Sequence, residues 1–121
     1  MEPALMMKTA FVLLTITALG GIVMAVIRLR RNVNPPSSFA MLHGLLAGSA
    51  LTLLLYGYFT VGLPALAGWA LLLFLLAALG GTYLNLAYHA KAVLLPKAIV
   101  VVHAVIAVVG YVMLLMASLR P

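Results

Sequence analysis

Cysteine is absent from this 121-residue chain, and Glu2 is its only acidic residue. The lack of cysteine excludes disulfides, thiolate metal sites and thiol catalysis. A single acidic residue near the N-terminus excludes hydrolysis by paired carboxylates, carboxylate metal clusters and carboxylate-based antiport. Charged residues make up 7% of the chain, against roughly 25% in soluble domains. Such a chain cannot cover a water-facing surface, so a soluble globule is excluded.

Hydrophobic residues are abundant instead, at 67% of the chain. A membrane-spanning helix needs about 20 mostly apolar residues, and four runs of that length are present. The predicted spans are about Thr9–Ile27, Phe39–Thr60, Ala65–Tyr88 and Ala98–Leu119. We therefore expect an all-α integral membrane protein, a four-transmembrane-helix bundle that forms a single domain over residues 1–121.

Short polar or turn-forming segments separate these runs. The stretch Asn34–Ser38 combines turn formers with a serine N-cap and predicts the start of the second helix. The stretch Val61–Pro64 predicts a hairpin turn before the third helix. The first apolar run also has features of a cleavable signal peptide, since a basic residue precedes it. It is longer than a typical signal core and another hydrophobic helix follows it, so we expect it to be a span.

Positive charge is distributed unevenly along the chain. The two connections, between the first and second spans and between the third and fourth, hold five of the seven basic residues: Arg28, Arg30, Arg31, Lys91 and Lys97. Lys8 and Arg120 fall on the opposite side. Cytoplasmic loops are enriched in Lys and Arg, which predicts a bacterial or archaeal cytoplasmic membrane with both termini outside. Nucleic-acid binding needs a solvated basic face, and this apolar chain has none. The expected partner is therefore the lipid bilayer.

An offset of 60 positions aligns several landmarks of the chain with one another. Ala18–Gly21 falls on Ala78–Gly81, Pro36 on Pro96, and His43 on His103. This pattern predicts a tandem two-helix repeat of about 60 residues, with repeats at about 1–60 and 61–121. A duplicated hairpin keeps its orientation, so matched positions should lie at matched depths in the membrane.

The two matched histidines are the leading candidates for a site. Each follows its proline by seven positions, which places it roughly 10 Å along its helix. The second and fourth helices run in the same direction, so the imidazoles of His43 and His103 can face each other. One interpretation is interhelical hydrogen bonding. The other is axial ligation of a haem, which needs two imidazoles on opposite sides of a flat ring.

Small residues and polar groups near this depth favour a cofactor. Gly20-Gly21 and Gly80-Gly81 would let the backbone approach the macrocycle. Arg28 follows Gly21 by seven positions on the same helix face, where its guanidinium could bind a propionate. Asn85 and Tyr88 could hydrogen-bond to a propionate or a quinone, or only anchor the helix at the interface.

Glycine on helices one and three, with histidine on helices two and four, resembles the haem-carrying four-helix core of the membrane b-type cytochromes. The resemblance is strongest to cytochrome b of quinol-oxidising complexes. That family usually carries a second histidine on each His-bearing helix, and this chain has none. The resemblance implies one haem b held by His43 and His103 near the cytoplasmic side. It also implies electron exchange with quinol or a redox partner, by a homo-oligomer or a quinol-linked oxidoreductase subunit.

Two other functions remain open from the sequence. A non-redox structural or accessory subunit would use the histidines as hydrogen bonds between helices, and His→Gln would then be mild at both sites. A small transporter or a copper or zinc site would combine His43, His89 and His103. The predicted spans contain no carboxylate that could couple transport to an ion, which disfavours coupled transport.

Overall fold

The computed structural model describes residues 1–120, which are helical almost throughout and contain no strand. The four long helices are α1 (Pro3–Arg31), α2 (Ser37–Tyr56), α3 (Ala65–Ala87) and α4 (Lys97–Leu119). A short π-helical segment, η1 (Gly57–Val61), continues α2, and a 3₁₀ turn, η2 (His89–Lys91), follows α3. Each of the four is long and apolar enough to cross a membrane, so the prediction of four such helices is confirmed.

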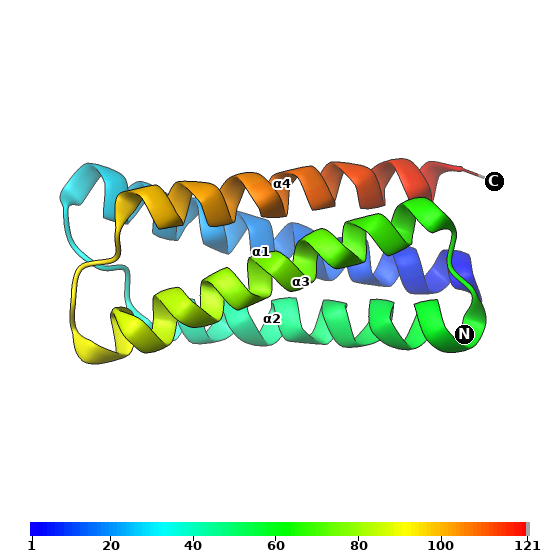
Figure 1. Ribbon diagram of the computed structural model, residues 1–121, viewed down its shortest axis with the longest axis horizontal. Coiled ribbons are helices and arrows are strands. Elements are labelled where there is room, and N and C mark those ends of the chain that lie inside the picture. The colour runs from blue at the N-terminus through cyan, green and yellow to red at the C-terminus, as the bar shows by residue number, and fades with distance from the viewer. Residues whose placement is uncertain (121) are drawn as a thin grey trace.

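The helices run side by side along the long axis, and successive helices are antiparallel (Figure 1). Helix α1 packs along α2, and α3 along α4, which gives two hairpins. The hairpins meet through contacts of α1 with α4 and of α2 with α3, so α2 and α4 lie across the bundle from each other. Both termini lie at the same end of the bundle, which we call the terminal end.

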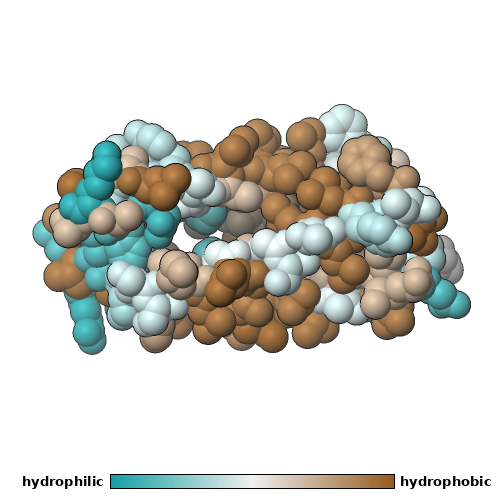
Figure 2. Space-filling model, turned by 90° about the horizontal axis from the view of Figure 1, so that it is seen from below, coloured by the Kyte–Doolittle hydropathy of each residue, from teal (hydrophilic) through white to brown (hydrophobic). Residues whose placement is uncertain are grey.

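The α1–α2 and α3–α4 connections lie at the opposite end, which we call the basic end (Figure 1). It carries the five basic residues of the two connections. Figure 2 shows hydrophilic atoms gathered at this end and hydrophobic atoms over most of the rest of the visible face. The bundle thus has one strongly cationic end and a long apolar flank.

Two helix starts differ from the sequence prediction. Helix α1 begins at Pro3, six residues earlier than expected, because proline suits the first turn, where its missing N–H costs no hydrogen bond. Helix α2 has Pro36 at its N-cap with no side-chain hydrogen bond, and Ser37 is its first helical residue. The predicted serine cap is therefore wrong.

The ends of α1 and η2 share one backbone feature. Helix α1 continues to Arg31, four residues further than predicted, because arginine is a good helix former and basic side chains stabilise a helix C-terminus. It ends at Asn32 in the left-handed conformation, with φ 54°. Ala92, 60 positions later, ends η2 with the same φ of 54°.

The buried apolar side chains form two separate clusters along the bundle. The larger cluster fills the half nearer the terminal end and draws on all four helices, with Leu14, Leu54, Phe74 and Leu114 among its members. The smaller cluster, Leu84, Leu95 and Val100, closes the basic end. The section between the two clusters contains both predicted haem ligands.

Candidate functional site

His43 and His103 make the same hydrogen bond in the two hairpins. The Nδ1 of His43 lies 2.9 Å from the carbonyl oxygen of Thr17, and the Nδ1 of His103 lies 2.8 Å from that of Ala77. Thr17 and Ala77 are themselves 60 positions apart, and both are buried. A carbonyl only accepts, so Nδ1 carries a proton in each ring, and in the neutral form of the ring Nε2 keeps its lone pair.

The two imidazoles lie close together across the bundle. Their ring centroids are 6.3 Å apart, and the ring planes are inclined by 64°. Two imidazoles bound in line on opposite sides of a metal would have centroids about 6.4 Å apart, from metal–nitrogen bonds of about 2.05 Å and the ring radius. Rotation about a metal–nitrogen bond leaves this separation unchanged, so the inclination of the planes is compatible with such a pair.

The donor set also fits a haem iron. Metal-binding histidines almost always donate the other ring N–H to a carbonyl or carboxylate, which fixes the tautomer and the ring orientation. Both histidines here already have that second bond, to the backbone of the neighbouring helix in the same hairpin. Each imidazole is therefore held by a rigid element with one nitrogen available.

One glycine of each pair lies against an imidazole, a contact that the sequence did not predict. A Cβ on Gly21 would lie 3.0 Å from Cε1 of His43, and one on Gly81 would lie 3.1 Å from Cε1 of His103. Gly21 and Gly81 therefore make room for the imidazoles, and the predicted approach of the backbone to a macrocycle stays a prediction. Their neighbours contribute less: a Cβ on Gly20 meets nothing within 4 Å, and one on Gly80 makes an ordinary contact with His103 at 3.7 Å.

The surroundings distinguish this level of the bundle from the rest. The imidazoles lie between the two apolar clusters, where the buried side chains are the small Thr17 and Ala77. An opening between helices is visible near the hydrophilic end in the space-filling view (Figure 2). In the half nearer the terminal end, leucine and phenylalanine side chains fill the interior. That half offers no second pair of imidazoles.

Arg28 has partners within the protein. Its side chain is only 6% exposed, its Nε donates to the carbonyl of Leu95 at 2.7 Å, and its Nη1 donates to Oδ1 of Asn32 at 3.0 Å. It therefore fastens the α3–α4 connection to the end of α1. The predicted contact of Arg28 with a propionate stays a prediction, because these bonds occupy only part of the guanidinium.

The other sequence candidates lie nearer the basic end. Tyr88 pairs with Tyr83 through their hydroxyls, 3.3 Å apart, and Asn85 is half-buried on α3. His89 lies in η2, and its Nε2 is 2.8 Å from the carbonyl of Pro35. Among residues 1–120, no three His, Cys, Asp or Glu side chains come together as a metal site. A three-histidine copper or zinc site would need His43, His89 and His103 to come together, and in the described part of the chain they do not.

Sequence reasoning missed two polar contacts. Asn34 donates from Nδ2 to the carbonyl of Val93 at 2.8 Å and accepts from the N–H of Leu95 at 3.0 Å, whereas the pattern indicated only a turn former. The hydroxyls of Thr15 and Tyr111 are 2.8 Å apart between α1 and α4. A tyrosine within an apolar run was a usable signal, because its hydroxyl needs a partner when buried.

Comparison with protein-family models, with curated proteins and with solved structures finds no match to this chain.

Proposed function

We propose that this chain is a small membrane electron carrier that holds one haem b between His43 and His103. The observation that carries the proposal is the paired imidazoles: centroids 6.3 Å apart, with Nδ1 of each ring bonded to a backbone carbonyl. In the neutral form of the rings, this arrangement leaves the Nε2 lone pairs of two imidazoles on opposite helices available as metal ligands. The haem, when bound, supplies one-electron oxidation and reduction.

The same proposal includes a membrane orientation. Four long apolar helices and a cluster of five basic residues support insertion with the basic end in the cytoplasm and both termini outside. The matched hydrogen bonds and left-handed residues at a 60-residue offset support an origin by duplication of one hairpin. The haem would then lie nearer the cytoplasmic side.

The chain's own residues have defined tasks in this proposal. Thr17 and Ala77 orient the imidazoles through their carbonyls, and Gly21 and Gly81 provide the space that the rings need. The apolar cluster at the terminal end limits the bundle to a single haem. Electrons would then be exchanged with quinol or a redox partner near the basic end rather than passed across the whole membrane.

Optical spectra of protein purified from haem-replete cells test the proposal. We expect the sharp reduced bands of a low-spin b-type haem in the wild type, and their loss in both His43→Ala and His103→Ala. His89→Ala is the matched control and should keep the full spectrum, because His89 bonds to Pro35 outside the bundle interior. A folded, colourless wild type would contradict the proposal.

A second candidate function rests on the same hydrogen bonds. Each histidine already joins the two helices of its hairpin, which is what a structural or accessory subunit without a cofactor would need. That function predicts colourless protein and a loss of stability, rather than of absorbance, on removal of either imidazole.

A further inference from the structure

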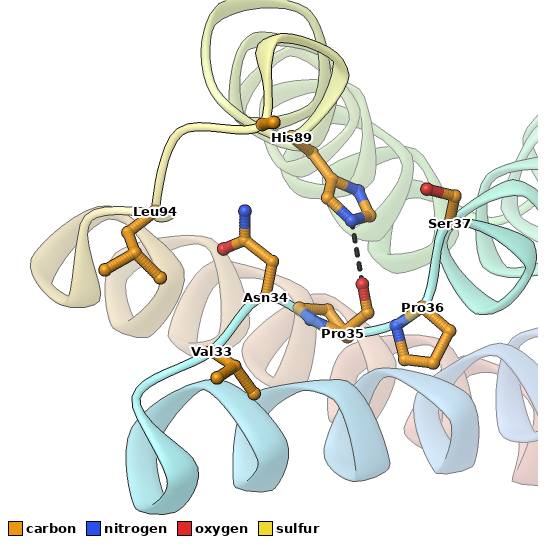
Figure 3. A pocket seen from close by; sticks show the side chains of 8 residues that line it. Val33, Asn34, Pro35, Pro36, Ser37, His89 and Leu94 are labelled. Atoms are coloured by element: carbon orange, nitrogen blue, oxygen red, sulfur yellow. Dashed lines mark hydrogen bonds between the residues drawn. The ribbon is translucent and has the colours of Figure 1, made fainter.

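A wide-open surface cavity of about 470 Å³ lies between the two connections at the basic end, apart from the imidazole pair. The α1–α2 connection and the start of α2 contribute Val33, Asn34 and Ser37, and the α3–α4 connection contributes His89 and Leu94. Figure 3 shows the polar groups of Asn34, Ser37 and His89 gathered around this space. Its volume lies within the range of about 300–1,000 Å³ that is common for ligand sites in proteins, although it is open on one side.

Hydrogen bonds hold the walls of this cavity in place. Asn34 joins the connections through two bonds, to Val93 and to Leu95. His89 adds a third bond, from its Nε2 to the carbonyl of Pro35 at 2.8 Å (Figure 3). Because a carbonyl only accepts, Nε2 of His89 is the donor in this bond. The cavity is therefore a built feature of the fold rather than a gap between loose loops.

The charged residues nearest in sequence to the cavity lining are basic. Arg31 precedes the lining residue Val33 by two positions, and Lys91 directly precedes the lining residue Ala92; both basic side chains are exposed. Glu2, the only carboxylate side chain of the chain, lies at the opposite end. The exposed cations that flank the lining residues in sequence thus have no acidic side chain at this end to pair with.

We propose that this cavity binds the phosphodiester headgroup of an anionic phospholipid. Ser37 offers a hydroxyl donor, and Arg31 and Lys91 supply charge. Val33 and Leu94, 49% and 46% exposed, line the same cavity and would contact the apolar part of a lipid. A free phosphate would use only the polar groups, so the apolar lining favours the lipid as the source. The proposal rests on membrane insertion but not on haem binding.

Charge variants of the full chain in neutral detergent test this site. Titration with short-chain phosphatidylglycerol, phosphatidylcholine and inorganic phosphate should show binding of phosphatidylglycerol alone at micromolar to millimolar concentration. Each basic residue near an anionic surface contributes about 1 kcal/mol, so Arg31→Gln with Lys91→Gln should weaken that binding roughly 10–30-fold. Lys8→Gln with Arg120→Gln removes the same charge from the other end and should change nothing.

A second pair of variants tests the cavity itself. Ser37→Leu places a bulky side chain in the lining without changing charge and should also weaken binding, whereas exposed Ser38, outside the lining, should tolerate leucine. Equal binding of phosphatidylcholine, equal binding of phosphate alone, or equal effects of the two charge pairs would overturn the proposal. The absorbance of the same samples reports haem separately, so failure here is distinguishable from failure of the haem proposal.

Discussion

At the scale of single residues, the site is two copies of one contact. A histidine donates from Nδ1 to a carbonyl 26 positions earlier, and a glycine four positions after that carbonyl leaves space for the ring. The first glycine of each pair, Gly20 or Gly80, makes a weaker contact or none. Gly20 can therefore serve as the control for Gly21, and Gly80 as the control for Gly81.

Gly21→Ala should displace the His43 ring, because the added Cβ would lie 3.0 Å from Cε1. We expect a loss of about 1–3 kcal/mol in the free energy of unfolding, as for other overpacked interiors, and a weaker haem spectrum. Gly20→Ala is the control and should be close to neutral, since its Cβ meets nothing within 4 Å. Thermal unfolding in detergent followed by Trp69 fluorescence measures both; equal losses in the two variants would argue against the contact.

His43→Asn separates the structural role from ligation. The asparagine amide nitrogen stands where Nδ1 stood, so it can still donate to the carbonyl of Thr17, but no Nε2 remains. In haem-free preparations we expect His43→Ala to lose about 0.6–1.7 kcal/mol and His43→Asn to lose less. Both should abolish the haem bands. A coloured His43→Asn protein would show that His43 is not a ligand.

At the scale of elements, the two connections repeat one backbone device with different side chains. Asn32 and Ala92 both adopt φ 54°, a left-handed conformation that asparagine tolerates and alanine does not favour. The connections are then joined by Asn34, His89 and Arg28, which bond to backbone groups of the neighbouring segment. The packing of the basic end thus keeps Ala92 in this unfavourable conformation.

Ala92→Gly should stabilise the protein by about 0.5–1 kcal/mol, because glycine adopts positive φ without the steric cost that alanine carries. Ala90→Gly, two residues earlier in η2 and equally exposed, provides the comparison. It should give no gain, since glycine there only adds freedom to the unfolded chain. The midpoint of thermal unfolding in one detergent is the measurement; a gain at position 90 alone would contradict this explanation.

At the scale of the whole molecule, composition and periodicity were enough to predict the architecture. Four apolar runs predicted four helices, and the 60-residue offset identified His43 with His103 as a pair, which the ring separation of 6.3 Å bears out as a contact. The contacts of Gly21 and Arg28 could not be predicted. They depend on how closely α1 approaches α2 and on where the α3–α4 connection folds back, and a one-dimensional pattern does not contain either distance.

The orientation in the membrane is also a property of the whole molecule, and the absence of cysteine makes it easy to test. Glu2→Cys lies at the terminal end and Ala90→Cys at the basic end, and both positions are exposed. A membrane-impermeant maleimide should label Glu2→Cys in intact cells and Ala90→Cys only after permeabilisation. The reverse pattern would place the basic end outside and contradict the charge argument.

The most direct test of the central claim is the haem content per chain, measured as haem extracted from purified wild-type protein against its peptide concentration. One pair of imidazoles and a filled apolar half at the terminal end predict one haem b per chain, and none in His43→Ala. A value near zero from haem-replete cells, or an unchanged value in His43→Ala, would contradict the account.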